Sequence, residues 1–224
     1  MATETKKPDV LTALAKGDAG PLCSYVQRVV LQQLRSTDWG VHGIGEAGFK
    51  AAIVGALATM IELHGFGMCI EVEAKLGGGR GYADIVLTTG SSIVVIELKY
   101  SSPYWTRSPL RNPITYGFLQ RPDGDARAAA ITALSEEALL AATVSYNKVK
   151  GVEQTRSVAG QLKLACEQSL RYGDMIGYSA DRPVHCIALV GVGPRIVFRG
   201  ALLPAPLPPL HPTVGIAAAV SDVV

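Results

Sequence analysis

Two apolar segments, residues 82–88 and 92–99, constrain this 224-residue chain more than any other feature. Each is predicted to be a β-strand, and a short turn of Thr, Gly and Ser residues joins them. Charged residues interrupt both: Asp84 lies in the first strand, and Glu97 and Lys99 lie near the end of the second. Because side chains alternate along a strand, Glu97 and Lys99 should share one face, and the neighbouring strand can bring Asp84 beside them. Charges at the rim of an apolar sheet are costly to bury, which indicates a functional site.

The remaining pattern predicts an α/β fold. The residues Phe49, Ile53 and Leu57 recur at helical spacing within an alanine-rich segment, so residues 46–64 are expected to form a helix. Further helices are expected at 21–34, 125–143 and 152–172, and further strands at 68–75, 184–190 and 195–199. This order favours a mixed central sheet with helices on both faces.

The expected organisation is a single domain with two appendages. Residues 1–20 are polar and are expected to be a flexible segment, and residues 21–200 are expected to form the domain. An insertion of loop and helix is expected at about 101–150, where prolines, arginines and aromatic residues gather. From residue 201 the chain is rich in proline, which predicts an extended tail over 201–224.

Composition narrows the class of protein only moderately. The formal net charge is +2, so charge alone does not argue for nucleic acid. The four cysteines, Cys23, Cys69, Cys166 and Cys186, form no C-x-x-C pair and are expected to be buried, reduced thiols. No signal-peptide pattern and no apolar run of membrane-spanning length is found, so we expect an intracellular protein without a membrane partner.

The segments Gly81-Tyr-Ala-Asp84-Ile-Val-Leu and Val95-Ile-Glu97-Leu-Lys99 resemble the PD-(D/E)XK nuclease superfamily. The surrounding order of a helix with an acidic residue, the strands, a later helix and a further strand is also similar to that family. The resemblance covers roughly residues 45–100 and 155–200. It departs from the pattern at Ala83, where the family name places a proline. It implies a restriction-endonuclease-like fold.

The resemblance also implies a Mg²⁺-dependent phosphodiesterase, with Mn²⁺ as a substitute metal. Asp84, Glu97 and the backbone carbonyl of Leu98 would ligate the metal, and Glu46 would complete the site from the preceding helix. Lys99 would position the attacking water. Magnesium is often held by one or two carboxylates plus waters and phosphate, which agrees with this set of residues. The substrate would be nucleic acid, with DNA favoured over RNA because most members of the family cut DNA.

Two further groups are candidate substrate-binding or supporting residues. Gln168 and Tyr172 have the Q-x-x-x-Y form of RecB-type members and of nuclease-like domains associated with AAA ATPases, and both lie on one face of the expected helix. In the insertion, Arg107 and Arg111 can contact phosphates and Trp105 can stack on a base. An insertion that merely packs its aromatic residues as a small core is an equal alternative.

Two other functions stay open at this point. A nuclease-like domain that has lost catalysis could serve as a module for binding nucleic acid or protein. An unrelated α/β enzyme could carry the Glu-x-Lys pattern by accident. By analogy with single-domain nucleases that dimerise to cut two strands, a homodimer is also expected.

Overall fold

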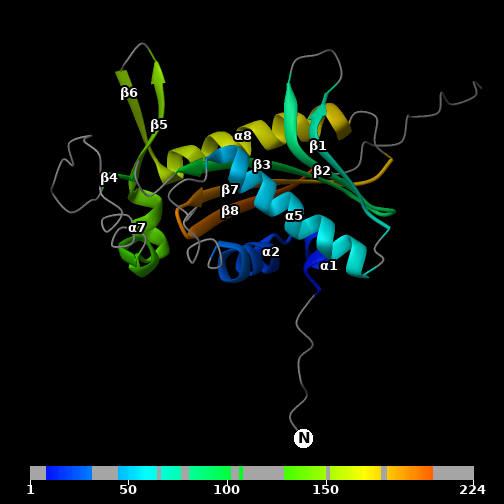
Figure 1. Ribbon diagram of the computed structural model, residues 1–224. Helices are drawn as coiled ribbons and strands as arrows, with labels where there is room; N and C mark the ends of the chain where they lie inside the picture. The colour runs from blue at the N-terminus through cyan, green and yellow to red at the C-terminus, as the bar shows by residue number, and fades with distance from the viewer. Residues whose placement is uncertain are drawn as a thin grey trace, which may run out of the picture.

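A five-stranded mixed sheet forms the centre of the protein (Figure 1). The computed structural model describes residues 9–31, 45–64, 67–76, 81–101, 106–107, 129–149, 152–177 and 181–203. The strands lie in the order β1-β2-β3-β7-β8. Their bounds are Cys69–Lys75 (β1), Tyr82–Thr88 (β2), Ile93–Ser101 (β3), Val184–Val192 (β7) and Arg195–Leu203 (β8). The expected mixed α/β architecture is therefore confirmed.

The sheet joins an antiparallel half to a parallel pair. Strands β1, β2 and β3 form an antiparallel meander, whereas β3 and β7 run parallel in continuous register from Ile93 opposite Val184 to Ser101 opposite Val192. Parallel neighbours need a long crossover connection, and the helix α8 (Val158–Gly177) lies within it. A tight turn then returns the chain into β8, antiparallel to β7.

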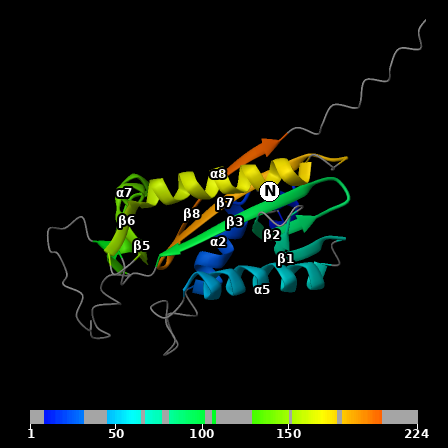
Figure 2. The same cartoon turned by 90° about the horizontal axis from the view of Figure 1, so that it is seen from above.

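Helices cover both faces of the sheet, as the sequence predicts. One face packs against α1 (Val10–Leu14), α2 (Gly20–Tyr25), the π-helical turn η1 (Val26–Leu31) and α5 (Glu46–His64). The other face packs against α8 and α7 (Glu136–Ala141). Figure 2 shows α5 and α8 on opposite sides of the strands.

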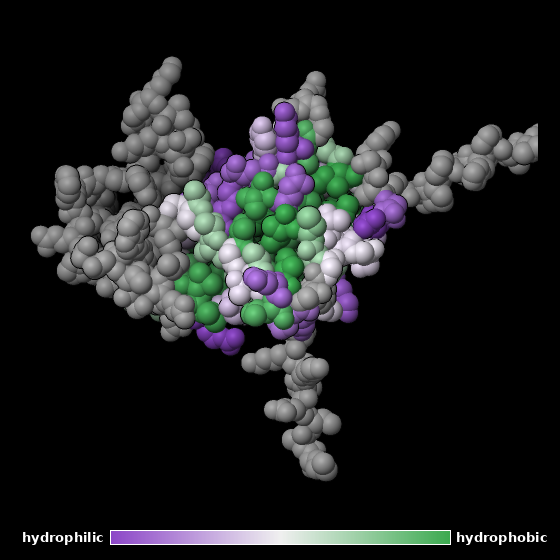
Figure 3. Space-filling model, turned by 45° about the vertical axis from the view of Figure 1, so that its right-hand side comes forward, coloured by the Kyte–Doolittle hydropathy of each residue, from purple (hydrophilic) through white to green (hydrophobic). Residues whose placement is uncertain are grey.

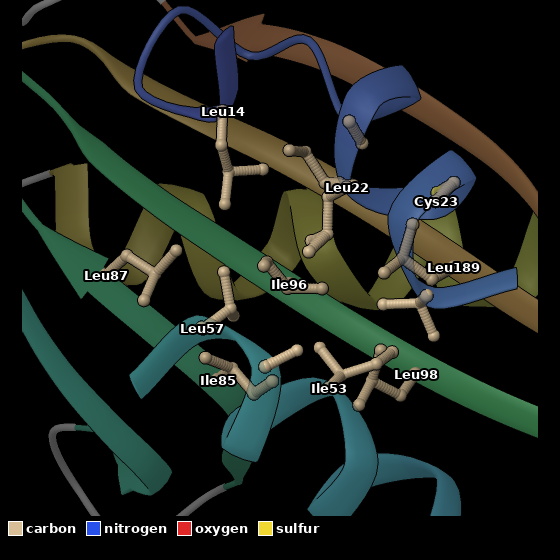
Figure 4. Close-up of a cluster of buried hydrophobic side chains, with 14 of the residues drawn as sticks. Leu14, Leu22, Cys23, Ile53, Leu57, Ile85, Leu87, Ile96, Leu98 and Leu189 are labelled. Carbon is tan, nitrogen blue, oxygen red and sulfur yellow. The ribbon is translucent and has the colours of Figure 1, made fainter. Parts of the chain in front are cut away.

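The larger core lies between one face of the sheet and the helices α1, α2, η1 and α5. Ile53 and Leu57 point from α5 towards Ile85, Ile96 and Leu98 of the strands (Figure 4). All five side chains are fully buried. Burial of each such side chain stabilises the fold by about 1.5–3 kcal/mol, so this cluster fixes how α5 lies on β2 and β3.

Helix α5 has the bounds that the sequence predicts, Glu46–His64. Among the described residues, it is the one helix that could cross a membrane by length and composition, although Phe49, Ile53 and Leu57 pack it against the sheet. Figure 3 shows apolar residues gathered on one side of the molecule with hydrophilic residues around them. Leu63 of α5 and Tyr82 of β2 are among the exposed apolar side chains.

The prediction of a helix over 152–172 is wrong for residues 152–157. Residues Val152–Ser157 form strand β6, which pairs with β5 (Thr143–Val149), and β5 also pairs with β4 (Thr106–Arg107). β-branched residues such as Val152 and Thr155 favour this second, three-stranded sheet. The helix α8 begins at Val158 instead and continues past Tyr172 to Gly177.

Two other expected helices have different bounds. In place of one helix over 125–143, a helical turn at 129–133 precedes α7, because the Ser135 hydroxyl accepts a hydrogen bond from the Ala138 N–H (3.2 Å) and caps a new helix there. The helix expected over 21–34 begins as α2 at Gly20 and continues as η1 to Leu31, and residues 32–34 lie outside the described residues.

The terminal expectations need correction at both ends. Within residues 1–20, expected to be flexible, Asp9 caps α1, and Leu11 and Leu14 of this helix are fully buried in the core. Strand β8 extends to Leu203, so the first residues of the expected 201–224 tail belong to the sheet. Residues 204–224 lie outside the described residues.

The expectation that all four cysteines are buried is only partly correct. Cys23 and Cys186 are buried, Cys166 is half-buried, and Cys69 is exposed at the start of edge strand β1. All four are free thiols in the structure, as expected.

Two helical glycines give a matched test of this packing. A Cβ on Gly173 of α8 would clash with Cys186 Sγ and lie 2.9 Å from Leu203 Cδ1, whereas a Cβ on Gly55 of α5 would meet no atom within 4 Å. We expect Gly173→Ala to lower the free energy of unfolding by about 1–3 kcal/mol through overpacking. Gly55→Ala should raise it by up to about 1 kcal/mol through helix propensity. Urea denaturation measures both, and a Gly173→Ala protein as stable as the parent would contradict the close contact of α8 with β7.

Candidate functional site

Strands β2 and β3 separate at Asp84. Their paired residues run from Thr88 opposite Ile93 to Ile85 opposite Ile96. Beyond that pair a side chain replaces the main-chain pairing: Oδ2 of the Asp84 carboxylate accepts a hydrogen bond from the Leu98 N–H at 2.9 Å. The carboxylate therefore holds the two strands together where their main chains diverge. We call this place, between Asp84 of β2 and residues 97–99 of β3, the fork.

The main-chain N–H and C=O groups of Leu98 project towards the fork. In a strand, the N–H and the C=O of one residue project to the same edge. Since the Leu98 N–H reaches Asp84, its carbonyl oxygen projects to the same side. The Leu98 side chain is fully buried on the α5 face, so its position along β3 is fixed by the core.

Glu97 is the most buried charged residue that the structure describes, with only 3% of its surface exposed. Lys99 Nζ donates a hydrogen bond to Glu97 Oε1 at 2.8 Å, which confirms that the two side chains lie on one face. Burial raises the pKa of Glu97 to about 7 against the lowering effect of Lys99, and the nearby carboxylates of Asp84 and Glu46 raise it further. Among the described residues, the other oxygen, Oε2, is buried and has no hydrogen-bond partner.

Helix α5 brings two charged residues to the fork. Glu46 lies in its first turn, with Oε1 3.9 Å from Lys99 Nζ, so the structure brings together the four expected catalytic residues. One turn later, Lys50 Nζ lies 2.8 Å from Asp84 Oδ1 and 3.0 Å from Glu73 Oε1 of β1. The sequence pattern assigns Lys50 no role, although its i, i+4 spacing from Glu46 places both on one helix face.

Electrostatics keep both lysines charged. Burial lowers the pKa of Lys99, but the hydrogen bond to Glu97 and the surrounding carboxylates outweigh this and raise it. The pKa of Lys50 is raised in the same way, because Asp84 and Glu73 outweigh the effect of its burial. Both side chains are therefore ammonium ions at neutral pH.

Tyr172 of α8 packs beside the fork, on the face of the sheet opposite to α5. Its ring is buried among Ala83, Val86 and Val95, and it lies against Gly81 at the entrance to β2. A Cβ on Gly81 would be 2.9 Å from the ring, so glycine at this position allows the close packing of α8. The Tyr172 hydroxyl accepts a hydrogen bond from Arg171 at 3.2 Å.

The other candidate supporting residues are less defined. Gln168 is half-buried on α8, and among the described contacts none joins Gln168 or Tyr172 to the charged groups of the fork. Arg107 lies in β4, but its side chain is outside the described part. Trp105 and Arg111 lie entirely outside the described residues, so their predicted substrate contacts stay predictions.

The donor set at the fork suits a small divalent cation. Within the described ranges, no three Asp, Glu, His or Cys side chains are grouped closely enough to hold a metal by themselves. Magnesium, however, commonly binds one or two carboxylates and retains several waters. The buried Oε2 of Glu97, which no described residue hydrogen-bonds, is an oxygen donor of the required kind, with Asp84 and the Leu98 carbonyl nearby.

Comparison with known proteins adds no assignment. No protein-family model, curated protein or solved structure matches this chain. Its function must therefore be inferred from the residues of the fork.

The buried Glu97 makes stability depend on pH in the metal-free protein. The folded state holds a proton up to about pH 7, whereas the ordinary pKa of this carboxyl is 4.5, so raising the pH between these values destabilises the fold. Gln at this position has no proton to lose. Without metal, we expect the free energy of unfolding of Glu97→Gln, relative to the parent, to rise by on the order of 2 kcal/mol across this interval.

Urea denaturation in EDTA at a series of pH values measures this difference. Glu62→Gln, at an exposed position on α5, is the control and should show no such trend. A Glu97→Gln difference that stays flat with pH would show that Glu97 is not desolvated.

Proposed function

We propose that this protein is a metal-dependent nuclease that hydrolyses phosphodiester bonds, with DNA favoured over RNA. The observation that carries the proposal is the buried Oε2 of Glu97 beside Asp84 and Lys99, which has no hydrogen-bond partner within the part of the chain that the structure describes. A protein interior seldom leaves a carboxylate oxygen without a partner unless a ligand or a chemical role requires it. The preference for DNA, and the restriction-endonuclease-like form of the fold, depend on the family resemblance.

In this proposal Asp84, Glu97 and the Leu98 carbonyl hold Mg²⁺ or Mn²⁺, and Glu46 completes the set from α5. The bound metal would supply Lewis-acid polarisation of the phosphate and an acidified water. Asp84 also keeps the fork in shape, because its second oxygen accepts the Leu98 N–H.

Lys99 acts as a cation in this scheme and not as a base. Its raised pKa keeps the ammonium protonated at neutral pH, and an ammonium has three N–H donors. One donor is engaged by Glu97, so two others can orient a water and offset negative charge that develops on the phosphate. Glu97 in turn holds Nζ in place through the 2.8 Å contact.

A second function, binding without catalysis, is favoured by a different observation. Both carboxylates are paired with lysines, Asp84 with Lys50 and Glu97 with Lys99. Such pairs can stabilise a fold in which the charges have no catalytic task. A domain of this kind would bind nucleic acid or protein but would cut nothing.

Cleavage assays separate the two functions. Supercoiled plasmid, linear duplex DNA, single-stranded DNA and RNA are each incubated with Mg²⁺, with Mn²⁺ and with EDTA. We expect cleavage of DNA with either metal and none with EDTA. Asp84→Asn and Lys99→Ala should each reduce the rate by at least about 100-fold, because each removes a group that acts on the reacting atoms.

The matched controls are Lys163→Ala on α8 and Asp181→Asn, whose side chains are 78% and 79% exposed. Both should cleave at the parental rate. Equal activity in the parent and in Lys99→Ala would contradict the nuclease assignment. Binding of DNA without cleavage by any of these proteins would support the second function.

A further inference from the structure

Lys50 is a charged residue at the fork to which the nuclease pattern assigns no role. Its side chain is only 16% exposed, and it approaches the Asp84 carboxylate, itself 14% exposed, to 2.8 Å. It lies on the same face of α5 as Glu46. Its ammonium is therefore a fixed positive charge in contact with a proposed metal ligand.

Both oxygens of Asp84 are engaged by N–H donors. Oδ1 accepts from Lys50 and Oδ2 accepts from the Leu98 N–H. A divalent cation that coordinates Asp84 would lie close to the Lys50 ammonium, and like charges a few ångströms apart repel strongly where water is largely excluded. Lys50 and the metal must therefore compete for the Asp84 carboxylate.

Glu73 is the second partner of Lys50. Its Oε1 lies 3.0 Å from the same Nζ, and its side chain is 67% exposed on β1. Glu73 also has a φ of 53°, the left-handed region that a residue with a side chain adopts only at a cost. This backbone conformation occurs opposite Asp84, at the position where the β1–β2 register omits a pair.

We propose that Lys50 is a built-in counter-cation that bridges Asp84 and Glu73 in the metal-free protein and transfers fully to Glu73 when a divalent metal binds. This inference depends on the proposed metal centre. It gives Glu73 the task of drawing Lys50 away from Asp84, so the two residues set the metal affinity in opposite directions. Removal of Lys50 should tighten metal binding, and removal of Glu73 should weaken it.

The test is calorimetric titration of the full-length protein with Mn²⁺, which reports binding without any measurement of activity. We expect Lys50→Met to bind Mn²⁺ about tenfold more tightly than the parent, which corresponds to about 1.4 kcal/mol. Lys75→Met, which removes an exposed cation from the same strand as Glu73, is the control for a general change of field and should alter the affinity by less than about twofold.

A double-variant cycle then tests the transfer. Glu73→Gln should weaken Mn²⁺ binding several-fold in the parent, but this effect should largely vanish when Lys50→Met is also present, because Glu73 then has no lysine to receive. A Glu73→Gln effect of equal size in both backgrounds would overturn the transfer. The Glu73→Gln arm also keeps the inference testable if thermal melts show that Lys50→Met does not fold.

The outcomes separate the inference from the function on which it depends. Mn²⁺ binding by the parent with equal affinity in Lys50→Met would overturn the role of Lys50 and leave the metal centre standing. Absence of Mn²⁺ binding by both proteins would overturn the metal centre and the inference together.

Discussion

The cost of burying the Glu97 carboxylate is the constraint around which the site is arranged. β3 lies at the centre of the sheet, and both of its faces are covered by helices, so a charge there loses most of its water. Lys99 offsets only part of this cost, because one oxygen of Glu97 is still without a partner among the described residues. Three features lie near Glu97: the end of the pairing between β2 and β3, the carboxylate of Asp84 and the first turn of α5. A ligand bound there could interact with the Glu97 oxygen that Lys99 does not contact.

The local parts of this arrangement can be predicted from sequence. The alternation along β3 places Glu97 and Lys99 on one face, and the alanine-rich repeat of apolar residues gives α5 its bounds. These features depend on neighbours within one element, which the sequence displays directly. The meeting of Asp84 with β3 is also predictable, since a short turn leaves two antiparallel strands little choice of register.

The features that the sequence does not predict depend on contacts between distant segments. Neither the parallel pairing of β3 with β7 nor the packing of Tyr172 against Gly81 follows from a local pattern. The hairpin of β5 and β6 escapes prediction because β6 ends at Ser157 and α8 begins at the next residue, so no turn signal separates the strand from the helical pattern that follows it. The role of Lys50 is not predicted for another reason. A lysine on a helix is usually solvated, and only its contacts with Glu73 and Asp84 in the folded protein make this one part of the fork.

The sheet is anchored unequally on the two sides of β3. Nine residue pairs join β3 to β7, whereas only four join it to β2. Asp84 and Glu73 belong to the β1–β2 hairpin, whereas Glu97 and Lys99 belong to β3, which has the longer register with β7. The charged residues of the site are therefore divided between two parts of the sheet that only four residue pairs join directly. Their relative positions depend on those four pairs, on the buried side chains that β2 packs against α5, and on the hydrogen bond from the Leu98 N–H to Asp84.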